Sequence, residues 1–508
     1  MSLSRITRIV LILAVTVMGI GVAVPAAAQG DNTLIMARAV DATGLDPHMQ
    51  TAFASLRLLE LIYEPLILAD ENLNLVPALA ESWAFSEDGL HLTLNLRQGV
   101  TFHDGSDFTA EDVIASLERI LDEETGSATR TNLLSIESIE APDDYTVVLN
   151  LTLPDVPLVA ALSSINTAIL PSEVIANGDP AADVVGTGPF MLESWQPEEK
   201  TLLKANPNYW GDGPFVDGIE IRIIPDEATI MAALRAGEVD FVMFNDPLIA
   251  TLPVGDATIT INRAPEISYH VLQLRAVVEP LDKLEVRQAI SCAIDRQEVV
   301  DVAALGEGQV TGPLTMPAWA VPLDELFCYE QDLERARELM KQAGLEEGFT
   351  LPVIASASEP PTALPEAQVI QEQLKAINIT VEIESLEFGT YIDRWLAADF
   401  VAAIALNGGR PDPYPMYSRY WQRDAQFNNV AGYIDDTLDR LMKEGQVETD
   451  PVARYEIFAE FQRHLAEMSP WVWLYIGYTY TGQQAYVTDF IPTPTGSIYY
   501  LSQVKLNR

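Results

Sequence analysis

Two adjacent side chains, those of His103 and Asp104, could together carry out acid–base chemistry. They lie between leucines that alternate with polar residues over 90–96 and a helical pattern that begins after Thr109. Thr109 is followed three positions later by an acidic residue, which is typical of a capped helix start. No other histidine lies nearby and no nucleophile motif accompanies the pair. We therefore predict a strand-to-helix connection with no catalytic role.

Other patterns that could do chemistry are incomplete. The segment 186–189, Gly-Thr-Gly-Pro, lacks the lysine and the following helix of a phosphate loop and predicts a turn. Neither Gly-x-Ser-x-Gly nor His-Glu-x-x-His occurs, so a secreted α/β hydrolase is only the alternative interpretation. The histidines have no ligand spacing, so we expect no catalytic residue, metal site or cofactor, although a metal inside a small chelator stays open. They are His48, His91, His103, His270 and His464.

Length and charge narrow the class of protein. A chain of 508 residues is long enough for two or more domains. It carries 74 acidic and 30 basic residues, a net charge of −44, which repels the phosphates of nucleic acid and anionic lipid. The acidic residues are scattered, as on a solvated surface. We expect a soluble protein that does not bind nucleic acid.

The N-terminus has the features of a secretory signal peptide. Arg5 and Arg8 precede an apolar run over 9–24, and three alanines at 26–28 form a small-residue cleavage site. We predict a signal peptide at 1–28, with the mature chain beginning near Gln29. No cysteine stands at the cleavage site, so a lipid anchor is not expected. The predicted location is the periplasm, outside the cytoplasm.

The chain has two cysteines, Cys292 and Cys328. Export permits a disulfide, but Cys292 lies on an apolar helical stripe where free buried thiols are common. The sequence leaves both states open.

Strand and helix patterns alternate along the chain and predict an α/β fold. In the first half, a strand over 218–225 precedes a helix that Asp226 caps and Gly237 ends. The second half shows the same alternation, with a helix predicted over 284–300 and a buried strand over 470–476. Two such halves place small-molecule sites in the crevice between them.

Ordered motifs over nearly the whole mature chain resemble one known family. The chain resembles the extracytoplasmic solute-binding proteins of ABC transporters, in the family of dipeptide-, oligopeptide- and nickel-binding proteins. The motifs include GLDPH (44–48), YEPLI (63–67), PALAESWAFSEDGLHLTLNLRQGVTFHDGSDFTAEDVIASLERI (77–120), GTGPFMLESW (186–195), NPNYWGDGPFVDGIEIRIIPDEATIMAALRAGEVD (206–240), VRQAISCAIDR (286–296) and DLERARELMKQAG (332–344).

The resemblance implies a two-lobed clamshell, the type II periplasmic-binding-protein fold, with an additional α/β domain inserted in lobe I. It places the discontinuous lobe I at 29–65, 181–270 and 476–508, the additional domain at 66–180 and lobe II at 271–475. The implied function is capture of a peptide-like or other small polar solute between the lobes for delivery to an ABC permease, by a monomer. A ligand-sensing receptor of the same fold stays an alternative.

The segment ALNGGRPDPYPMYSRYW (405–421) is rich in glycine, proline and aromatic residues, which predicts a loop. The family resemblance implies that this loop contacts the solute. In peptide-binding relatives the matching loop has an aspartate that pairs with the peptide amine, and that position falls here on Gly409 or Arg410. The Arg410 guanidinium offers a planar fork for a carboxylate or similar anion. Alternatively, Arg410 pairs internally with Asp412.

The family pattern also places other side chains at the cleft. Each of the aromatic residues could instead be packed in a core. The complete set of expected solute-binding residues is Phe53, Phe244, Asn245, Trp319, Asn407, Arg410, Asp412, Tyr414 and Trp421.

Overall fold

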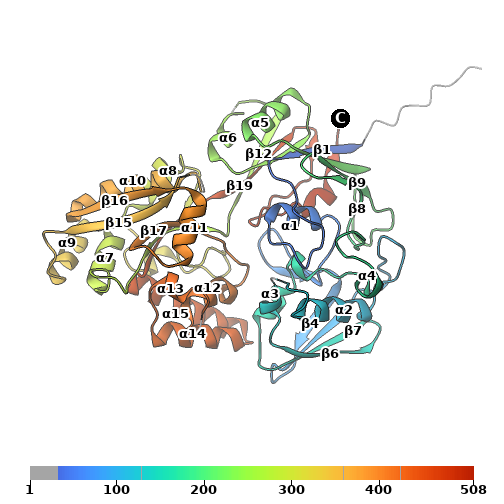
Figure 1. The fold of residues 1–508 in the computed structure, drawn as a ribbon, viewed down its shortest axis with the longest axis horizontal. Helices are drawn as coiled ribbons and strands as arrows, with labels where there is room; N and C mark the ends of the chain where they lie inside the picture. Colours follow the sequence, from blue (N-terminus) through green and yellow to red (C-terminus); the bar gives the residue numbers. More distant parts are fainter. Residues whose placement is uncertain (1–31, 128, 254, 358–359, 424) are drawn as a thin grey trace, which may run out of the picture.

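The computed structural model describes residues 32–127, 129–253, 255–357, 360–423 and 425–508. The chain forms two lobes side by side, and a smaller domain extends one of them (Figure 1). The predicted signal peptide at 1–28 and the predicted start of the mature chain lie outside the described residues.

Lobe I is built on a seven-stranded mixed sheet. Its strand β1 lies at the centre and pairs in parallel with β10 on one side and β11 on the other. Asp226 caps α5 and Gly237 ends it in the left-handed conformation, as the sequence predicts. The strands in order are β12 (Ile259–Pro265), β19 (Tyr478–Gln484), β11 (Phe241–Phe244), β1 (Thr33–Arg38), β10 (Gly218–Ile223), β9 (Lys200–Ala205) and β8 (Phe190–Gln196), with helices α1 (Phe53–Leu59), α5 (Glu227–Ala236) and α6 (Pro247–Thr251).

The additional domain packs α2 on a four-stranded antiparallel sheet. Leu92, Leu94 and Leu96 are buried, so the predicted alternation marks one core-facing side. Thr109 and Asp112 form the predicted capping box at the start of α2. The strands in order are β4 (Ala80–Phe85), β5 (His91–Leu96), β7 (Thr146–Leu151) and β6 (Ile136–Asp143); nearby are α2 (Ala110–Leu121), α3 (Pro157–Ala161), α4 (Ser172–Asn177) and the pair β2 (Ile67–Ala69) and β3 (Leu75–Pro77).

Lobe II is built on a six-stranded mixed sheet whose strands β13 and β18 are buried along their whole length. A strand covered on both faces is apolar along most of its length. The sequence predicts β18 from such a continuous apolar run. The strands in order are β14 (Gln309–Val310), β18 (Trp471–Ile476), β13 (Tyr269–Leu274), β17 (Ala402–Asn407), β15 (Phe349–Ser356) and β16 (Ile379–Leu386).

One helix predicted in lobe II differs in the structure. The helix predicted over 284–300 is broken into two, because Ile294 leaves the helical conformation and Asp295 caps a new helix. The helices are α7 (Leu284–Ala293), α8 (Arg296–Ala303), α9 (Leu333–Gln342), α10 (Ala363–Leu374), α11 (Phe388–Leu396), α12 (Pro413–Trp421), α13 (Asn428–Ala431), α14 (Asp436–Val447) and α15 (Pro451–Met468). A last pair of strands, β20 (Val487–Thr488) and β21 (Lys505–Leu506), follows in the C-terminal segment.

Two chain segments connect the sheets of the lobes. The chain leaves β12 of lobe I and enters β13 of lobe II through residues 266–268, and it returns from β18 to β19 through Gly477. The Glu266 N–H donates to the Gly477 carbonyl at 3.0 Å, so the two crossings lie together as a hinge. Farther away, the Val156 N–H of the additional domain donates to the carbonyl of Gln446 on α14 at 3.1 Å.

Cys292 and Cys328, whose state the sequence leaves open, form a disulfide. It ties α7 to the segment before α9, and Cys292 lies in the core of lobe II.

We expect reduction of this disulfide to lower the free energy of unfolding by about 2–4 kcal/mol, because the bond closes a loop in the unfolded chain. Its cysteines are 36 residues apart in the sequence. Urea unfolding with and without dithiothreitol measures the effect, and a Cys292→Ala/Cys328→Ala variant is the control that should not respond to the reductant. An equal response of both proteins would contradict the prediction.

Candidate functional site

The His103 side chain fastens a turn and does no chemistry. Its Nδ1 accepts from the Gly186 N–H at 3.2 Å and its Nε2 lies 2.9 Å from the Gly188 carbonyl oxygen, so the ring is neutral with the proton on Nε2. The Asp104 carboxylate accepts hydrogen bonds from the Ser106 backbone and hydroxyl. His103 thus holds the 186–189 turn against the additional domain, while Asp104 closes its own turn, as in the predicted strand-to-helix connection.

A short loop after β17, residues 408–412, joins the sheet of lobe II to α12; we call it the cleft loop. A Cβ atom on Gly409 would lie 2.0 Å from the carbonyl oxygen of Ile267 in the hinge. No other residue type fits there without moving one of the two segments. The cleft loop is therefore pressed directly against the hinge, where the two lobes meet.

The part of the predicted loop after the cleft loop is a helix. Asp412 caps α12 by accepting from the Tyr414 N–H at 2.9 Å, and Pro413 occupies the first helical turn. Proline suits that position because its missing N–H would be unpaired anyway. The prediction of a loop over 405–421 is therefore wrong for 405–407, which end β17, and for 413–421, which form α12.

Asp412 is held by an arginine from another helix. The Arg454 guanidinium on α15 donates to both Asp412 carboxylate oxygens, at 2.6 and 2.8 Å. Both side chains are buried, and the same guanidinium lies over the rings of Trp319 and Phe458. The alternative in which Arg410 pairs with Asp412 is thus contradicted, because Arg454 occupies both oxygens of that carboxylate.

Arg410 remains exposed on the cleft loop. Its Nη1 donates to the carbonyl of Gly409 at 2.9 Å. Loss of hydration, and then the neighbouring Arg419 charge, lower the pKa of Arg410. Burial raises the pKa of the half-buried Tyr414, and the carboxylate of Asp155 in the additional domain adds to the effect. This side of lobe II therefore faces the additional domain.

Other predicted residues of lobe II lie below this surface. Trp421 has no exposed surface and packs edge to face on Trp471 at 5.0 Å, which is the core position that the sequence left as the alternative. Asn407, at the end of β17, is buried, and its Nδ2 has no hydrogen-bond partner in the described part of the chain. Trp319 is half-buried and packs edge to face on Phe458. These side chains support the cleft loop from beneath.

Lobe I contributes a shallow hollow beside the hinge, lined among others by Arg57, Phe244 and Asn245. Phe244 is otherwise buried and stacks on Tyr480 with ring centroids 5.5 Å apart, whereas Asn245 is exposed. Phe53, at the start of α1, is 64% exposed. Phe53 and Asn245 are thus accessible, and Phe244 presents only an edge.

The sequence analysis missed two carboxyl groups in lobe I, and one of them, Glu60, contacts Ser497 in the wall of this hollow. Glu64 has no exposed surface; it accepts hydrogen bonds from Thr187, Tyr209 and Trp210, and a longer one from the Tyr499 hydroxyl at 3.5 Å. Burial outweighs these donors and raises the pKa of Glu64 to about 7. Burial likewise raises the pKa of the half-buried Glu60 to about 7, although the Ile498 N–H and the Ser497 hydroxyl donate to it.

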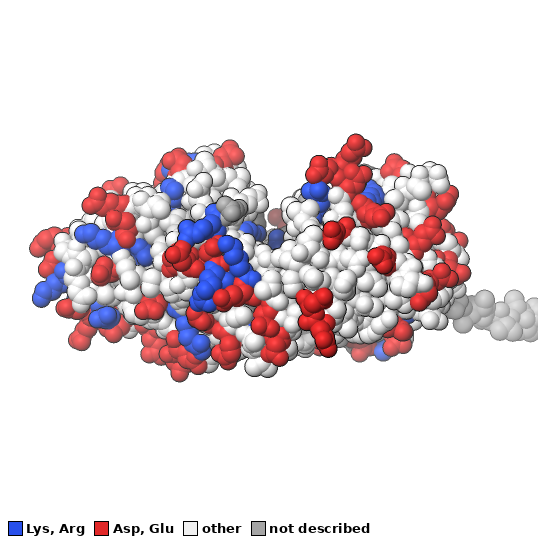
Figure 2. Space-filling view, turned by 90° about the horizontal axis from the view of Figure 1, so that it is seen from below, with Lys and Arg blue, Asp and Glu red and all other residues white. Residues whose placement is uncertain are grey.

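A notch separates the two lobes in the space-filling view, and acidic side chains cover much of the surface on both sides of it (Figure 2). In the described residues no group of three or more His, Cys, Asp or Glu side chains is arranged to hold a metal ion. None of the helices described is both long and apolar enough to cross a membrane.

Residues 74–429 match the model of the family "Bacterial extracellular solute-binding proteins, family 5 Middle". The chain belongs to this family. Its members are solute-binding transport proteins and not enzymes, so the hydrolase alternative is excluded for this family 5 protein. The fold is the type II clamshell with an additional domain, as predicted.

Relatives of this family 5 protein extend over most of its length. The dipeptide-binding protein of Escherichia coli (strain K12) is 27% identical, covering 78% of this chain and 79% of the relative. The structure of DppA from Helicobacter pylori with the peptide STSA is 28% identical and covers 94% of this chain and 98% of the other, with a TM-score of 0.75. AgaA of A. tumefacien R10 with agropinic acid is 27% identical and also has a TM-score of 0.75, covering 94% and 99%.

Proposed function

We propose that this protein captures a small polar solute in the notch between its lobes, closes about the hinge, and delivers the solute to an ABC permease. The observation that carries the proposal is the cleft loop, which carries exposed Arg410 and at the same time packs on hinge residue Ile267. A solute bound by the cleft loop therefore lies next to the two chain crossings that form the hinge. Closure follows if the solute binds the closed form more tightly than the open form.

The accessible members of the predicted set are proposed to contact the solute. They are the exposed Phe53, Asn245 and Arg410 and the half-buried Tyr414, with Phe244, Asn407 and Trp319 behind them. The relatives described above bind a peptide or agropinic acid, and this supports a solute of similar size. We further propose that the chain works as a monomer in the periplasm, exported by the signal peptide at 1–28.

A thermal-shift screen followed by small-angle scattering tests the proposal. The screen uses short peptides, oligosaccharides, organic acids and metal chelates, since a ligand that binds only the folded state raises the melting temperature. We expect one class to do so and the same compound to reduce the radius of gyration. Identical scattering curves with and without a saturating, tightly bound compound would overturn capture by closure.

A further inference from the structure

We infer that Arg410 and Arg419 together form a binding site for an oxyanion group of the solute, so that the transported compound carries a carboxylate, phosphate or sulfate. This inference rests on the proposed function, and it adds the chemical class of the solute. It also adds Arg419, a residue of α12 that the sequence analysis did not single out.

The two guanidinium groups meet at the cleft loop. Arg410 donates to the Gly409 carbonyl at 2.9 Å, and Arg419 donates to the adjacent Gly408 carbonyl at 2.8 Å. Arg419 also lies over the ring of Tyr420, 4.9 Å from its centroid. Two like charges are therefore held at one short segment of backbone, by contacts that neutralise neither of them.

No acidic side chain forms an ion pair with either arginine in the described part of the chain. The charged or titratable groups that act on Arg410 are Arg419, Tyr420 and Tyr269, with no carboxylate among them. Asp412, the nearest acid in the sequence, is engaged by Arg454. In a protein with 74 acidic and 30 basic residues, two adjacent arginines without a carboxylate are a departure from the surrounding surface.

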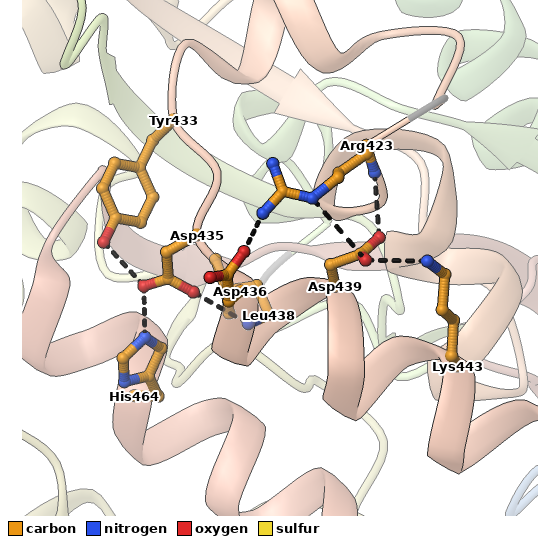
Figure 3. Close-up of polar contacts among 8 residues, drawn as sticks. All are labelled: Arg423, Tyr433, Asp435, Asp436, Leu438, Asp439, Lys443 and His464. Atoms are coloured by element: carbon orange, nitrogen blue, oxygen red, sulfur yellow. Dashed lines mark hydrogen bonds and ion pairs between the residues drawn. The ribbon is translucent and has the colours of Figure 1, made fainter.

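The neighbouring Arg423 shows the usual arrangement. It lies four positions after Arg419, ion-pairs with Asp436 and donates its backbone N–H to Asp439, which in turn binds Lys443 (Figure 3). Arg423 thus belongs to a solvated salt-bridge network on the outer helices. Arg410 and Arg419, at the cleft loop, have no such compensating carboxylates.

The chemistry of the pair favours an oxyanion. A guanidinium carries five N–H donors in a planar fork, and one hydrogen bond to a carbonyl leaves most of them available. The Nε of Arg419 is buried without a partner among the described residues. A carboxylate, phosphate or sulfate group can accept from both forks and cancel their repulsion. A solute that presented an ammonium here would add a third positive charge.

The test compares Arg410→Gln and Arg419→Gln with the matched control Arg423→Gln. Isothermal titration calorimetry is carried out with sodium phosphate, sodium sulfate and sodium succinate, at an ionic strength held constant with sodium chloride. We expect at least one of these anions to bind the wild-type protein. Each of the two cleft variants should weaken that binding by about tenfold or more, because charge-assisted hydrogen bonds are lost, whereas Arg423→Gln should not change it. Which anion binds distinguishes a carboxylate from a phosphate or sulfate group.

Urea unfolding of the solute-free variants supplies a second readout. Removal of one of two repelling charges is expected to leave the unfolding midpoint unchanged or to raise it, so a loss of binding cannot be attributed to misfolding. Absence of binding by all three anions, or equal binding by the wild-type protein and both cleft variants, would overturn the inference. A neutral or cationic compound that binds both cleft variants as tightly as wild type and still closes the lobes would overturn it too, while the proposed function would stand.

Discussion

Replacing Arg454 by alanine is expected to lower the free energy of unfolding by about 3–5 kcal/mol, since the change leaves the Asp412 carboxylate buried without its partner. Arg454 and Asp412 have side chains that are only 5% and 9% exposed. Arg454 also donates to the carbonyl of Gly445 at 2.7 Å, at the end of α14. One side chain thus holds α12, α14 and α15 together behind the cleft loop, and urea unfolding measures the loss.

Arg463 provides a control on the same helix. Its partner is Glu325, and both side chains are 45% exposed, so Arg463→Ala should cost no more than about 1 kcal/mol. A double variant, Arg454→Met with Asp412→Asn, removes both charges and keeps an acceptor for the Tyr414 N–H. It should recover most of the loss, because a buried pair is often replaced by uncharged groups at little cost. Equal effects of Arg454→Ala and Arg463→Ala would contradict the assignment.

Local signals in the sequence predicted the elements well. The caps at Thr109 and Asp226 and the buried strand Trp471–Ile476 depend on residues within a few positions of one another, and the structure has all three. The break at Asp295 shows the limit of periodicity, because apolar spacing continues across it while the backbone does not. Asp295 is a capping residue, and its type was the signal that could have revealed the break.

The site was harder to predict because its side chains are arranged by distant contacts. Asp412 and Arg454 are 42 residues apart and meet only because α12 and α15 pack together. Trp421 could have been a solute contact or a core residue, and residue type does not separate these roles. For Arg419 a signal was present, since it lies in the same segment as Arg410, but its proximity to Arg410 depends on the turn from the cleft loop into α12.

Glu64 is expected to make the protein less stable as the pH rises from about 4.5 to about 7. Its pKa is near 4.5 in the unfolded chain and about 7 in the folded state, so the folded state binds more protons within this window. Ionisation of the buried group then costs about 3 kcal/mol, complete above the folded pKa and absent below the unfolded one. Glu60 acts in the same direction, with a smaller effect of about 1–2 kcal/mol because water reaches it.

The variant Glu64→Gln isolates this effect from others of opposite sign. Burial lowers the pKa of His48 to about 4, so this residue makes the protein more stable as the pH rises towards 6.5, and the slope of the wild-type protein alone is a sum. A glutamine at position 64 can accept from Trp210 and Thr187 through its oxygen and donate to the Tyr209 hydroxyl, so the network survives without a charge. Urea unfolding at pH 5, 6, 7 and 8 should therefore show the variant becoming more stable relative to wild type by about 2.5 kcal/mol between the ends of this range. A constant difference across the range would mean that Glu64 is already ionised at pH 5, and that its hydrogen-bond donors outweigh its burial.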